Sequence, residues 1–313
     1  MVPQSHPPKK HTMNTRRTFL KTAGSAIAGL SLSPALRAAA APTSPLDVSI
    51  FSKHFIGLPF EQIAEIVANL GATGIEAPIR PGGHIEPAKV EEELPKFVEV
   101  LKKHGLRINV LTSGINSVSE ATRTESILRT AKALGIKRFR MNWYPYDNKK
   151  PIWPQLDEIK PRLQELVALC KEIGIQPCYQ NHSGAKMAGA AIWDMALLMR
   201  DYKPEELSWC FDIMHATIEG GTSWPTEVRL VRDHIAIAYF KNFVWEGPRH
   251  KAVPLGEGVV GKAYVDQLKS LDYRGPVCVH VEYLKGSVKD PDYLAKAIEA
   301  TRADIATLRS WWA

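Results

Sequence analysis

The stretch Trp209-Cys210-Phe211-Asp212-Ile213-Met214-His215-Ala216-Thr217-Ile218-Glu219-Gly220-Gly221 decides how the rest of the chain is interpreted. It begins as a short apolar run that ends abruptly in a carboxylate, and an imidazole and two glycines follow. Buried strands that deliver polar groups to a pocket have this pattern. We therefore expect a strand over 207–212 that ends at a functional site, and a loop beyond it that holds His215 and the two glycines.

Strand-like and helical patterns alternate on both sides of this stretch. Apolar runs predict strands over 46–51, 73–77, 107–111, 137–142, 175–180, 207–212, 235–241 and 276–282. Apolar residues at helical spacing predict helices over 61–70, 90–104, 119–134, 155–173, 190–200, 225–233, 263–271 and 291–311. Eight such units predict an α/β fold, a single-domain (β/α)8 TIM barrel over residues 46–313. A doubly wound open sheet is the alternative, but no G-x-G-x-x-G motif follows the first strand.

Residues 1–41 have the features of a twin-arginine signal peptide. Thr15-Arg16-Arg17-Thr18-Phe19-Leu20-Lys21 precedes a weakly apolar run, and Arg37-Ala38-Ala39-Ala40-Ala41-Pro42 resembles a cleavage site. The apolar run is too short and too rich in small residues for a stable spanning helix. We therefore expect an exported, periplasmic protein with no stable membrane span after the signal is cleaved.

The net charge of +7 comes from this leader. Residues 1–40 hold six of the 40 Lys and Arg residues and no acidic residue, so the remainder has 34 basic residues against 33 acidic ones. A nearly neutral domain has no electrostatic field that attracts a polyanion. We therefore expect no nucleic-acid partner, which argues against an endonuclease.

The four cysteines are predicted to be small buried hydrophobic residues. Cys178, Cys210 and Cys278 each lie two residues before the polar end of a predicted strand, and Cys170 lies in a predicted helix. No C-x-x-C pair is present. We therefore predict no disulfide bonds and no cysteine-based redox or zinc motif.

Period-2 alternation along the strands assigns many polar side chains to the barrel interior, at the ends where the strands stop. Burying so many ionisable groups is costly unless they pair with one another, a metal or a polar ligand. Active sites of this barrel lie at the same ends of the strands. A functional site is therefore predicted from Glu76, Arg140, Asn142, Gln180, His182, Asp212, Lys241, His280 and Glu282, with Arg80 and His84 in a following loop.

The chain resembles the sugar phosphate isomerase/epimerase family, part of the xylose-isomerase-like barrel superfamily, over residues 46–285. The resemblance rests on the order and spacing of short motifs rather than on any single one. These include Leu70-Gly71-Ala72-Thr73-Gly74-Ile75-Glu76, Arg80-Pro81-Gly82-Gly83-His84, Gln180-Asn181-His182-Ser183-Gly184, Phe211-Asp212, Phe240-Lys241-Asn242-Phe243, Pro254-Leu255-Gly256-Glu257-Gly258 and His280-Val281-Glu282-Tyr283.

The resemblance implies one divalent metal, held by Glu, Asp, His and Glu at the ends of strands five to eight. Asp212 and Glu282 match two of these positions, whereas Gln180 and Tyr239 replace the other two. A substitute set of metal ligands would consist of Asp212, Glu282, His182 and His215. These oxygen and nitrogen donors would suit Mn²⁺, Mg²⁺ or Zn²⁺. The alternative is a metal-free network of carboxylates and imidazoles around a sugar.

The implied reaction is isomerisation or epimerisation of a sugar by proton abstraction next to a carbonyl group. Glu282 is expected to be the general base, with a pKa raised by burial, and His182 or His215 the conjugate acid. Lys241 is expected to neutralise an enediolate oxygen or a phosphate, or else to form an ion pair with a neighbouring carboxylate such as Glu282. Substrate contacts are expected from Arg80, His84, Asn142, Gln180, His280 and Trp245.

Two other functions stay open. A lyase or hydratase acting on keto-glycosides would use the same first step, and a periplasmic sugar-binding barrel would have lost catalysis. The partner in each case is a small sugar. Trp311-Trp312 indicates a hydrophobic plug or a subunit contact, so a homo-oligomer is also expected.

Overall fold

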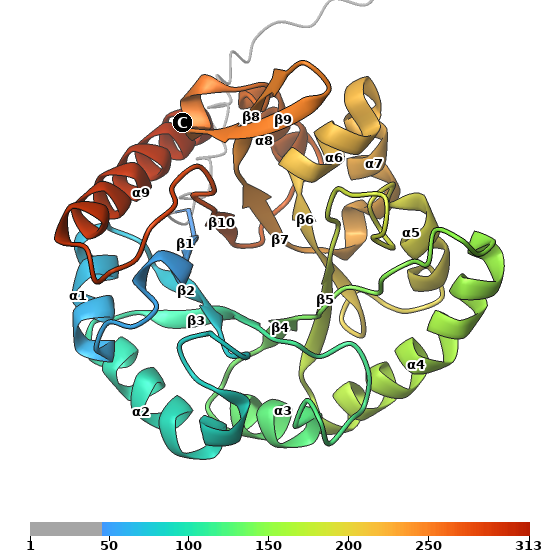
Figure 1. The fold of residues 1–313 in the computed structure, drawn as a ribbon, viewed down its shortest axis with the longest axis horizontal. Coiled ribbons are helices and arrows are strands. Elements are labelled where there is room, and N and C mark those ends of the chain that lie inside the picture. Colours follow the sequence, from blue (N-terminus) through green and yellow to red (C-terminus); the bar gives the residue numbers. More distant parts are fainter. Residues whose placement is uncertain (1–45) are drawn as a thin grey trace, which may run out of the picture. The chain divides into compact units, whose positions relative to one another are not determined.

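A computed structural model describes residues 46–313, which form a closed barrel of eight parallel strands (Figure 1). Around the barrel the strand order is β1-β10-β7-β6-β5-β4-β3-β2, so each strand pairs with its neighbours in the chain and β10 closes the ring against β1. This confirms the predicted TIM barrel. The strands are β1 (Val48–Phe51), β2 (Gly74–Pro78), β3 (Arg107–Thr112), β4 (Arg138–Arg140), β5 (Gln176–Gln180), β6 (Ser208–Asp212), β7 (Ile235–Phe240) and β10 (Val277–Val279).

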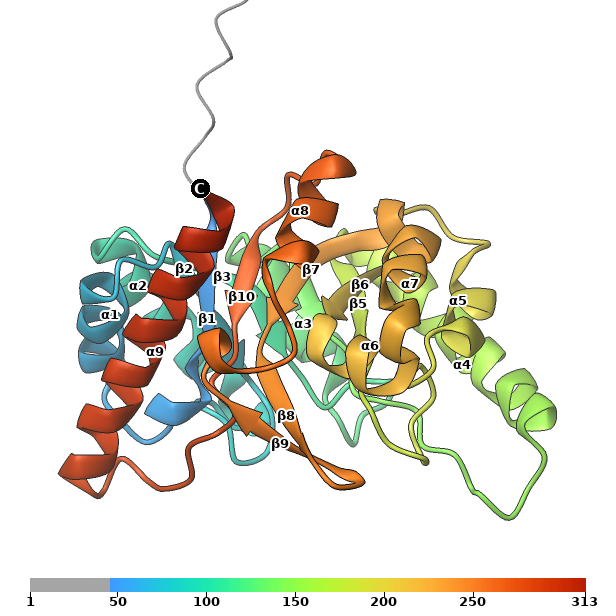
Figure 2. The same cartoon turned by 90° about the horizontal axis from the view of Figure 1, so that it is seen from above.

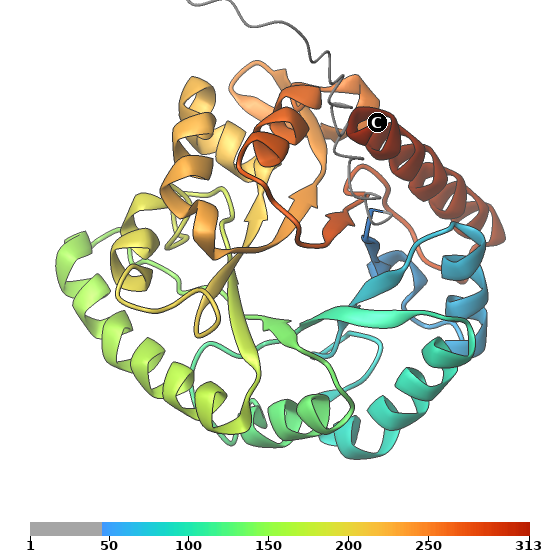
Figure 3. The same ribbon diagram turned by 180° about the vertical axis from the view of Figure 1, so that it is seen from behind.

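Helices surround the strands on the outside, as the ring in Figure 3 shows from the opposite face. Each predicted helix is present, with ends that shift by up to five residues. Helix α3 begins late because Arg123, just before it, has a left-handed backbone (φ 49°). The helices are α1 (Phe60–Asn69), α2 (Val90–Lys103), α3 (Thr124–Ala133), α4 (Ile152–Ile173), α5 (Trp193–Met199), α6 (Ile213–Gly220), α7 (Trp224–Val231), α8 (Lys262–Ser270) and α9 (Pro291–Trp312).

Helix α6 corrects the prediction of a loop after Asp212. The chain turns directly from β6 into this helix, and the Asp212 side chain caps it by accepting a hydrogen bond from the His215 backbone N–H at 3.3 Å. The segment is short and apolar on most sides because it is buried, so it lacks the period that marks an amphipathic helix. His215 therefore lies on a helix and has a fixed position.

A second unpredicted element is the antiparallel hairpin of β8 (Asn242–Glu246) and β9 (Arg249–Val253). Strand β9 is mostly charged and exposed, so it has no apolar pattern to reveal it. Figure 2 shows that the hairpin projects from the face of the barrel at which the strands end. Trp245, a predicted substrate contact, lies in β8 and leaves 49% of its surface exposed.

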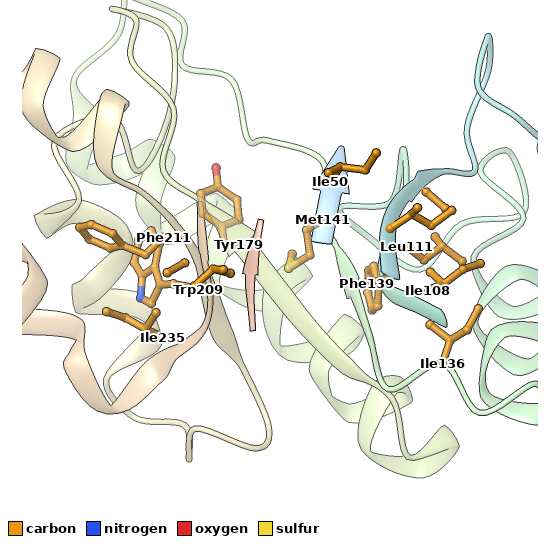
Figure 4. Packing of buried hydrophobic residues seen from close by; sticks show 14 of the residues in the cluster. Ile50, Ile108, Leu111, Ile136, Phe139, Met141, Tyr179, Trp209, Phe211 and Ile235 are labelled. Atoms are coloured by element: carbon orange, nitrogen blue, oxygen red, sulfur yellow. The ribbon is translucent and has the colours of Figure 1, made fainter. Parts of the chain in front are cut away.

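The core has two layers. The larger layer lies between the strands and the helices and includes Ile50, Phe139, Tyr179 and Trp209 (Figure 4). The smaller layer fills the barrel and consists of Phe51, Val110, Cys178, Cys210, Ile237, Tyr239 and Cys278. The three inward cysteines confirm the predicted alternation, and all four cysteines are buried free thiols.

The predicted signal peptide lies outside the described residues. Within residues 46–313, no helix combines the length and the apolar character that a membrane span requires.

The base of the hairpin depends on the buried side chain of Asn242. Its Nδ2 donates hydrogen bonds to the carbonyl oxygens of Leu255 (2.7 Å) and Val260 (2.8 Å). Its Oδ1 accepts hydrogen bonds from the backbone N–H groups of Phe243 (2.9 Å) and Val260 (2.7 Å). One amide therefore holds the loop before α8 against β8.

We expect Asn242→Ala to lower the free energy of unfolding by about 2–4 kcal/mol, because it leaves several buried backbone groups without partners. Urea denaturation of residues 46–313 measures this. The exposed Asn148→Ala is the matched control and should change stability by less than about 0.5 kcal/mol. Equal effects of the two variants would show that this amide does not anchor the hairpin.

Candidate active site

Asp212, at the end of β6, is fully buried and surrounded by donors. Its Oδ2 accepts hydrogen bonds from Lys241 Nζ at 3.0 Å and from Gln180 Nε2 at 2.7 Å. Lys241 follows β7 and Gln180 ends β5, so three neighbouring strands bring these groups together. Lys241 therefore forms an ion pair with a neighbouring carboxylate, although that carboxylate is Asp212 and not Glu282.

His215 is held as a neutral imidazole. Lys241 Nζ donates to its Nε2 at 2.7 Å, so the network assigns the ring proton to Nδ1, which lies 2.8 Å from Ser183 Oγ. Burial, followed by the charge of Lys241, holds the pKa of His215 well below its ordinary value. Its only unprotonated nitrogen is already bonded, so His215 has no lone pair for a substrate.

His182 is also neutral, but one nitrogen stays available. Its Nδ1 donates to the Ser183 carbonyl oxygen at 3.0 Å, and its ring lies 3.8 Å from the His215 ring and 4.7 Å from that of Trp143. Burial and the charge of Lys241 lower its pKa. No hydrogen bond within residues 46–313 engages Nε2, which leaves an unprotonated imidazole nitrogen, the usual form of a general base.

Glu76 on β2 is a second buried carboxylate with its own cation. Arg140 Nε lies 3.2 Å from its Oε1, Thr112 Oγ1 donates to the same atom at 2.5 Å, and His280 Nε2 lies 2.8 Å from Oε2. Burial would raise the pKa of Glu76, but Arg140 and His280 outweigh burial and lower it. The carboxylate is therefore ionised.

Arg140 joins the two carboxylates into one network. Its Nη1 donates to Gln180 Oε1 at 2.5 Å, while the amide nitrogen of Gln180 donates to Asp212. The orientation of this amide is assigned from these two partners. Gln180 was predicted to contact substrate, and both ends of its amide are occupied by protein groups.

Glu282 is less enclosed, with 27% of its side chain exposed, and it forms an ion pair with Lys53. Burial would raise its pKa, but Lys241, Lys53 and His280 together hold the pKa at about 2. The predicted upward shift is therefore wrong, because three cationic or imidazole neighbours surround the carboxylate. Glu282 is an ionised acceptor near neutral pH.

Arg80 and Asn142 line one pocket, and His84 does not take part in it. The pocket, of about 450 Å³, also has Ser113 and Gly114 on its wall, in the loops after β2 to β4. Arg80 is half-buried there and makes no ion pair within the described residues. His84 instead lies 2.9 Å from Ser52 Oγ, with a pKa lowered by burial to about 4.

Four contributors had no predicted role. Glu76 and Arg140 were assigned to the barrel interior without a function, and Lys53 and Ser183 were not singled out. Lys53 lies two residues beyond Phe51, whose side chain points into the barrel, so alternation continued past the strand would have indicated it. For Ser183 the sequence carries no comparable signal.

Residues 64–310 match the family described as Xylose isomerase-like TIM barrel, so the chain belongs to that family. Solved structures with the same fold include D-psicose 3-epimerase, studied in the presence of D-fructose (17% identity, 85% of this chain and 99% of that chain, TM-score 0.64). Another is 3-keto-D-glucoside 4-epimerase from E. coli (16%, 85% and 99%, TM-score 0.63). A third is the IolI protein with a bound zinc atom (14%, 85% and 98%, TM-score 0.65). No curated protein matches the chain in sequence.

One group of side chains has the geometry of a possible metal site. Within residues 46–313, Glu76, Cys278 and His280 bring three ligand atoms within 4.8 Å of one another. This group is not the substitute set predicted from the sequence. Its carboxylate already contacts the Arg140 guanidinium, and burial holds the pKa of the Cys278 thiol well above its ordinary value. The group would therefore have to lose a proton and an ion pair to bind a metal.

The positions implied by the family do not fit a metal either. At strand five, Gln180 turns its amide nitrogen toward Asp212 and gives its oxygen to Arg140. At strand seven, Tyr239 is a buried phenol whose pKa is raised well above its ordinary value by burial. Asp212 and Glu282 each carry a lysine partner. Two of the four positions thus offer no anionic or imidazole ligand.

The lowered pKa of Glu282 predicts a dependence of stability on pH. Its pKa in the folded protein, about 2, lies below its ordinary value of 4.5, so its contribution is present above about pH 4.5 and is lost as the pH falls toward 2. Over this window the free energy of unfolding should fall less steeply for Glu282→Gln than for the wild type. Guanidinium denaturation at a series of pH values measures the two slopes.

Glu65→Gln, which changes an exposed glutamate on α1, is the matched control for this measurement. Its slope should equal that of the wild type. Parallel curves for Glu282→Gln and the wild type would contradict the assignment of a buried, cation-paired carboxylate.

Proposed function

We propose that the protein is an exported sugar isomerase or epimerase that removes a proton from the carbon next to a carbonyl group. The proposal is carried by one observation: a neutral imidazole with a free nitrogen, His182, lies at the same barrel mouth as the Lys241 ammonium and the ionised Glu282. Membership of the xylose isomerase-like family and the fold shared with sugar epimerases support it.

His182 is proposed as the general base, in place of Glu282. Its Nε2 takes the proton from carbon, the electrons of the C–H bond form a C=C bond, and the carbonyl electrons move to oxygen to give an enediolate. For an isomer, the protonated imidazole returns the proton to the former carbonyl carbon. The hydroxyl proton on the first carbon moves to the former carbonyl oxygen at the same time, so that the carbonyl group forms on the first carbon. A neutral imidazole suits this transfer because its ordinary pKa lies near neutral pH, whereas a carboxylate with a pKa of about 2 is a weak base.

The other groups are proposed to bind and orient the sugar. Ionised Glu282 accepts a hydrogen bond from a hydroxyl group, and Lys241 donates to the oxygen that gains negative charge. Arg80 and Asn142 contact the part of the substrate that enters their pocket. Trp245, half-exposed on the hairpin, offers a ring face for stacking on a sugar.

Return of the proton to the opposite face of the same carbon would give an epimer and needs a second acid. A lyase acting on a keto-glycoside would share the first step and then expel a leaving group. The twin-arginine leader is the basis for proposing the periplasm as the site of action.

We expect His182→Gln to slow hydrogen–deuterium exchange next to the carbonyl of a keto sugar by about 10²- to 10⁴-fold, because general-base catalysis contributes that much. Exchange is followed by proton NMR in D₂O, with D-fructose as the first probe. His104→Gln changes a histidine at the end of α2, just before β3 begins and so not at the face where the strands end, and should exchange at the wild-type rate.

Glu282→Gln separates the two candidate bases. If Glu282 only orients a hydroxyl group, this variant should lose less activity than His182→Gln, with the loss mainly in KM. A greater loss of kcat in Glu282→Gln would return the role of base to that carboxylate. No loss of exchange in either variant would reject proton abstraction at this site.

A further inference from the structure

We propose that the Lys241 ammonium takes the place of the divalent metal that the family fold implies, and that the barrel mouth functions as a metal-independent site whose carboxylates are paired with side-chain cations. The starting observation is geometric. Asp212 is one of the two residues that match the metal positions implied by the family resemblance, and its Oδ2 lies 3.0 Å from Lys241 Nζ. A metal ion bound to Asp212 would need the position that the Lys241 ammonium already occupies.

The carboxylates at the mouth already have cationic partners. Glu76 pairs with Arg140, Asp212 with Lys241 and Glu282 with Lys53, so these three pairs sum to zero. The half-buried Arg80 is a fourth cation, and its charge acts on Glu76 and Glu282. A divalent ion added here would bring two positive charges without counter-charges into a largely buried region, where desolvation costs several kcal/mol per ion.

The replacement of Glu by Gln at position 180 follows the same logic. A carboxylate there would stand next to Asp212, where it would add a second negative charge beside a carboxylate and lose the donor that Gln180 now offers to Asp212. The neutral amide instead donates to Asp212 and accepts from Arg140, so it satisfies both neighbours without charge. Gln180 and Lys241 therefore both act against metal binding: the amide replaces a carboxylate ligand, and the ammonium occupies the place of the cation.

Lys241 also has the donors that the metal's chemical role requires. An ammonium group has three N–H bonds, and its partners within residues 46–313 are Asp212 and His215 Nε2, at 3.0 and 2.7 Å. The third N–H is left for a ligand oxygen. Two fixed acceptors hold the ammonium in position, which is the preorganisation that stabilises a developing oxyanion. This step rests on the proposed function, whereas the displacement of the metal does not.

The test begins with the metal itself and needs no substrate. Purified wild-type protein, dialysed and analysed by plasma mass spectrometry, should contain far less than one equivalent of Mn, Mg, Zn or Fe. Added MnCl₂ or ZnCl₂ should leave its melting temperature unchanged. One tightly held equivalent would overturn the proposal. Co²⁺ substitution would then show a thiolate absorption band if the ion lay at Cys278.

A gain-of-binding variant tests the role of Lys241 directly. Lys241→Ala combined with Gln180→Glu removes the ammonium and restores the carboxylate, so it should bind Mn²⁺ at least about tenfold more tightly than the wild type by calorimetry. Lys251→Ala combined with Gln180→Glu is the matched control, because Lys251 is an exposed lysine on β9, and should bind no better than the wild type. Equal affinity in the two double variants would overturn the proposal. Lys241→Met, which keeps the bulk of the side chain, checks folding by circular dichroism.

Exchange measurements separate this inference from the proposed function. Exchange that continues in the presence of EDTA at the wild-type rate, and is lost in Lys241→Met, supports both. Absence of exchange in the wild type would reject the function while the metal analysis and the double variants still decide the inference. Exchange that EDTA abolishes and Mn²⁺ restores would overturn the inference alone.

Discussion

The ion pair between Asp212 and Lys241 is the interaction on which the arrangement of the barrel mouth depends. Asp212 is fully buried, and a buried carboxylate is tolerated only when a cation and hydrogen-bond donors replace its lost water. Lys241 supplies the cation, Gln180 an amide donor and His215 a backbone donor. Removing any one of these would leave charge or polarity uncompensated, so the four residues constrain one another.

This constraint extends across the mouth through side chains on different strands. Gln180 is hydrogen-bonded to both Asp212 and Arg140, and Arg140 forms an ion pair with Glu76. The strands hold the participants rigidly because the barrel beneath them is packed with small and aromatic side chains. His182 is the exception, since it lies beyond the end of β5 and keeps one nitrogen free. The rigid part of the site thus neutralises charge, and this adjacent histidine keeps the free nitrogen on which the proposed proton transfer depends.

The sequence was sufficient to predict the barrel because the same strand-and-helix pattern recurs along the chain. Each βα unit has an apolar run followed by helical spacing, and the rule that side chains alternate placed Cys178, Cys210 and Cys278 correctly inside the barrel. The hairpin and α6 were not predictable in the same way. Strand β9 is too charged to show the apolar pattern of a strand, and α6 is too short and too buried to show the 3.6-residue spacing of an amphipathic helix.

The sequence predicted which strand residues point into the barrel mouth, but it missed Lys53 and Ser183 and could not predict how the side chains pair. Alternation identifies which residues point inward, yet it cannot say which cation meets which carboxylate, because that depends on distances between strands. For this reason the pKa of Glu282 was expected to rise with burial, whereas Lys241 and Lys53 lower it. The partner of Lys241 was likewise undetermined until Asp212 was found 3.0 Å away.

The most direct test of the account is an anomalous-scattering map from a crystal of the mature protein grown with MnCl₂ and recorded at the manganese edge. The account predicts no anomalous peak beside Asp212, and ordinary density for Lys241 Nζ at hydrogen-bond distance from its carboxylate. A peak within coordination distance of Asp212 and Glu282, with Lys241 turned away, would contradict it.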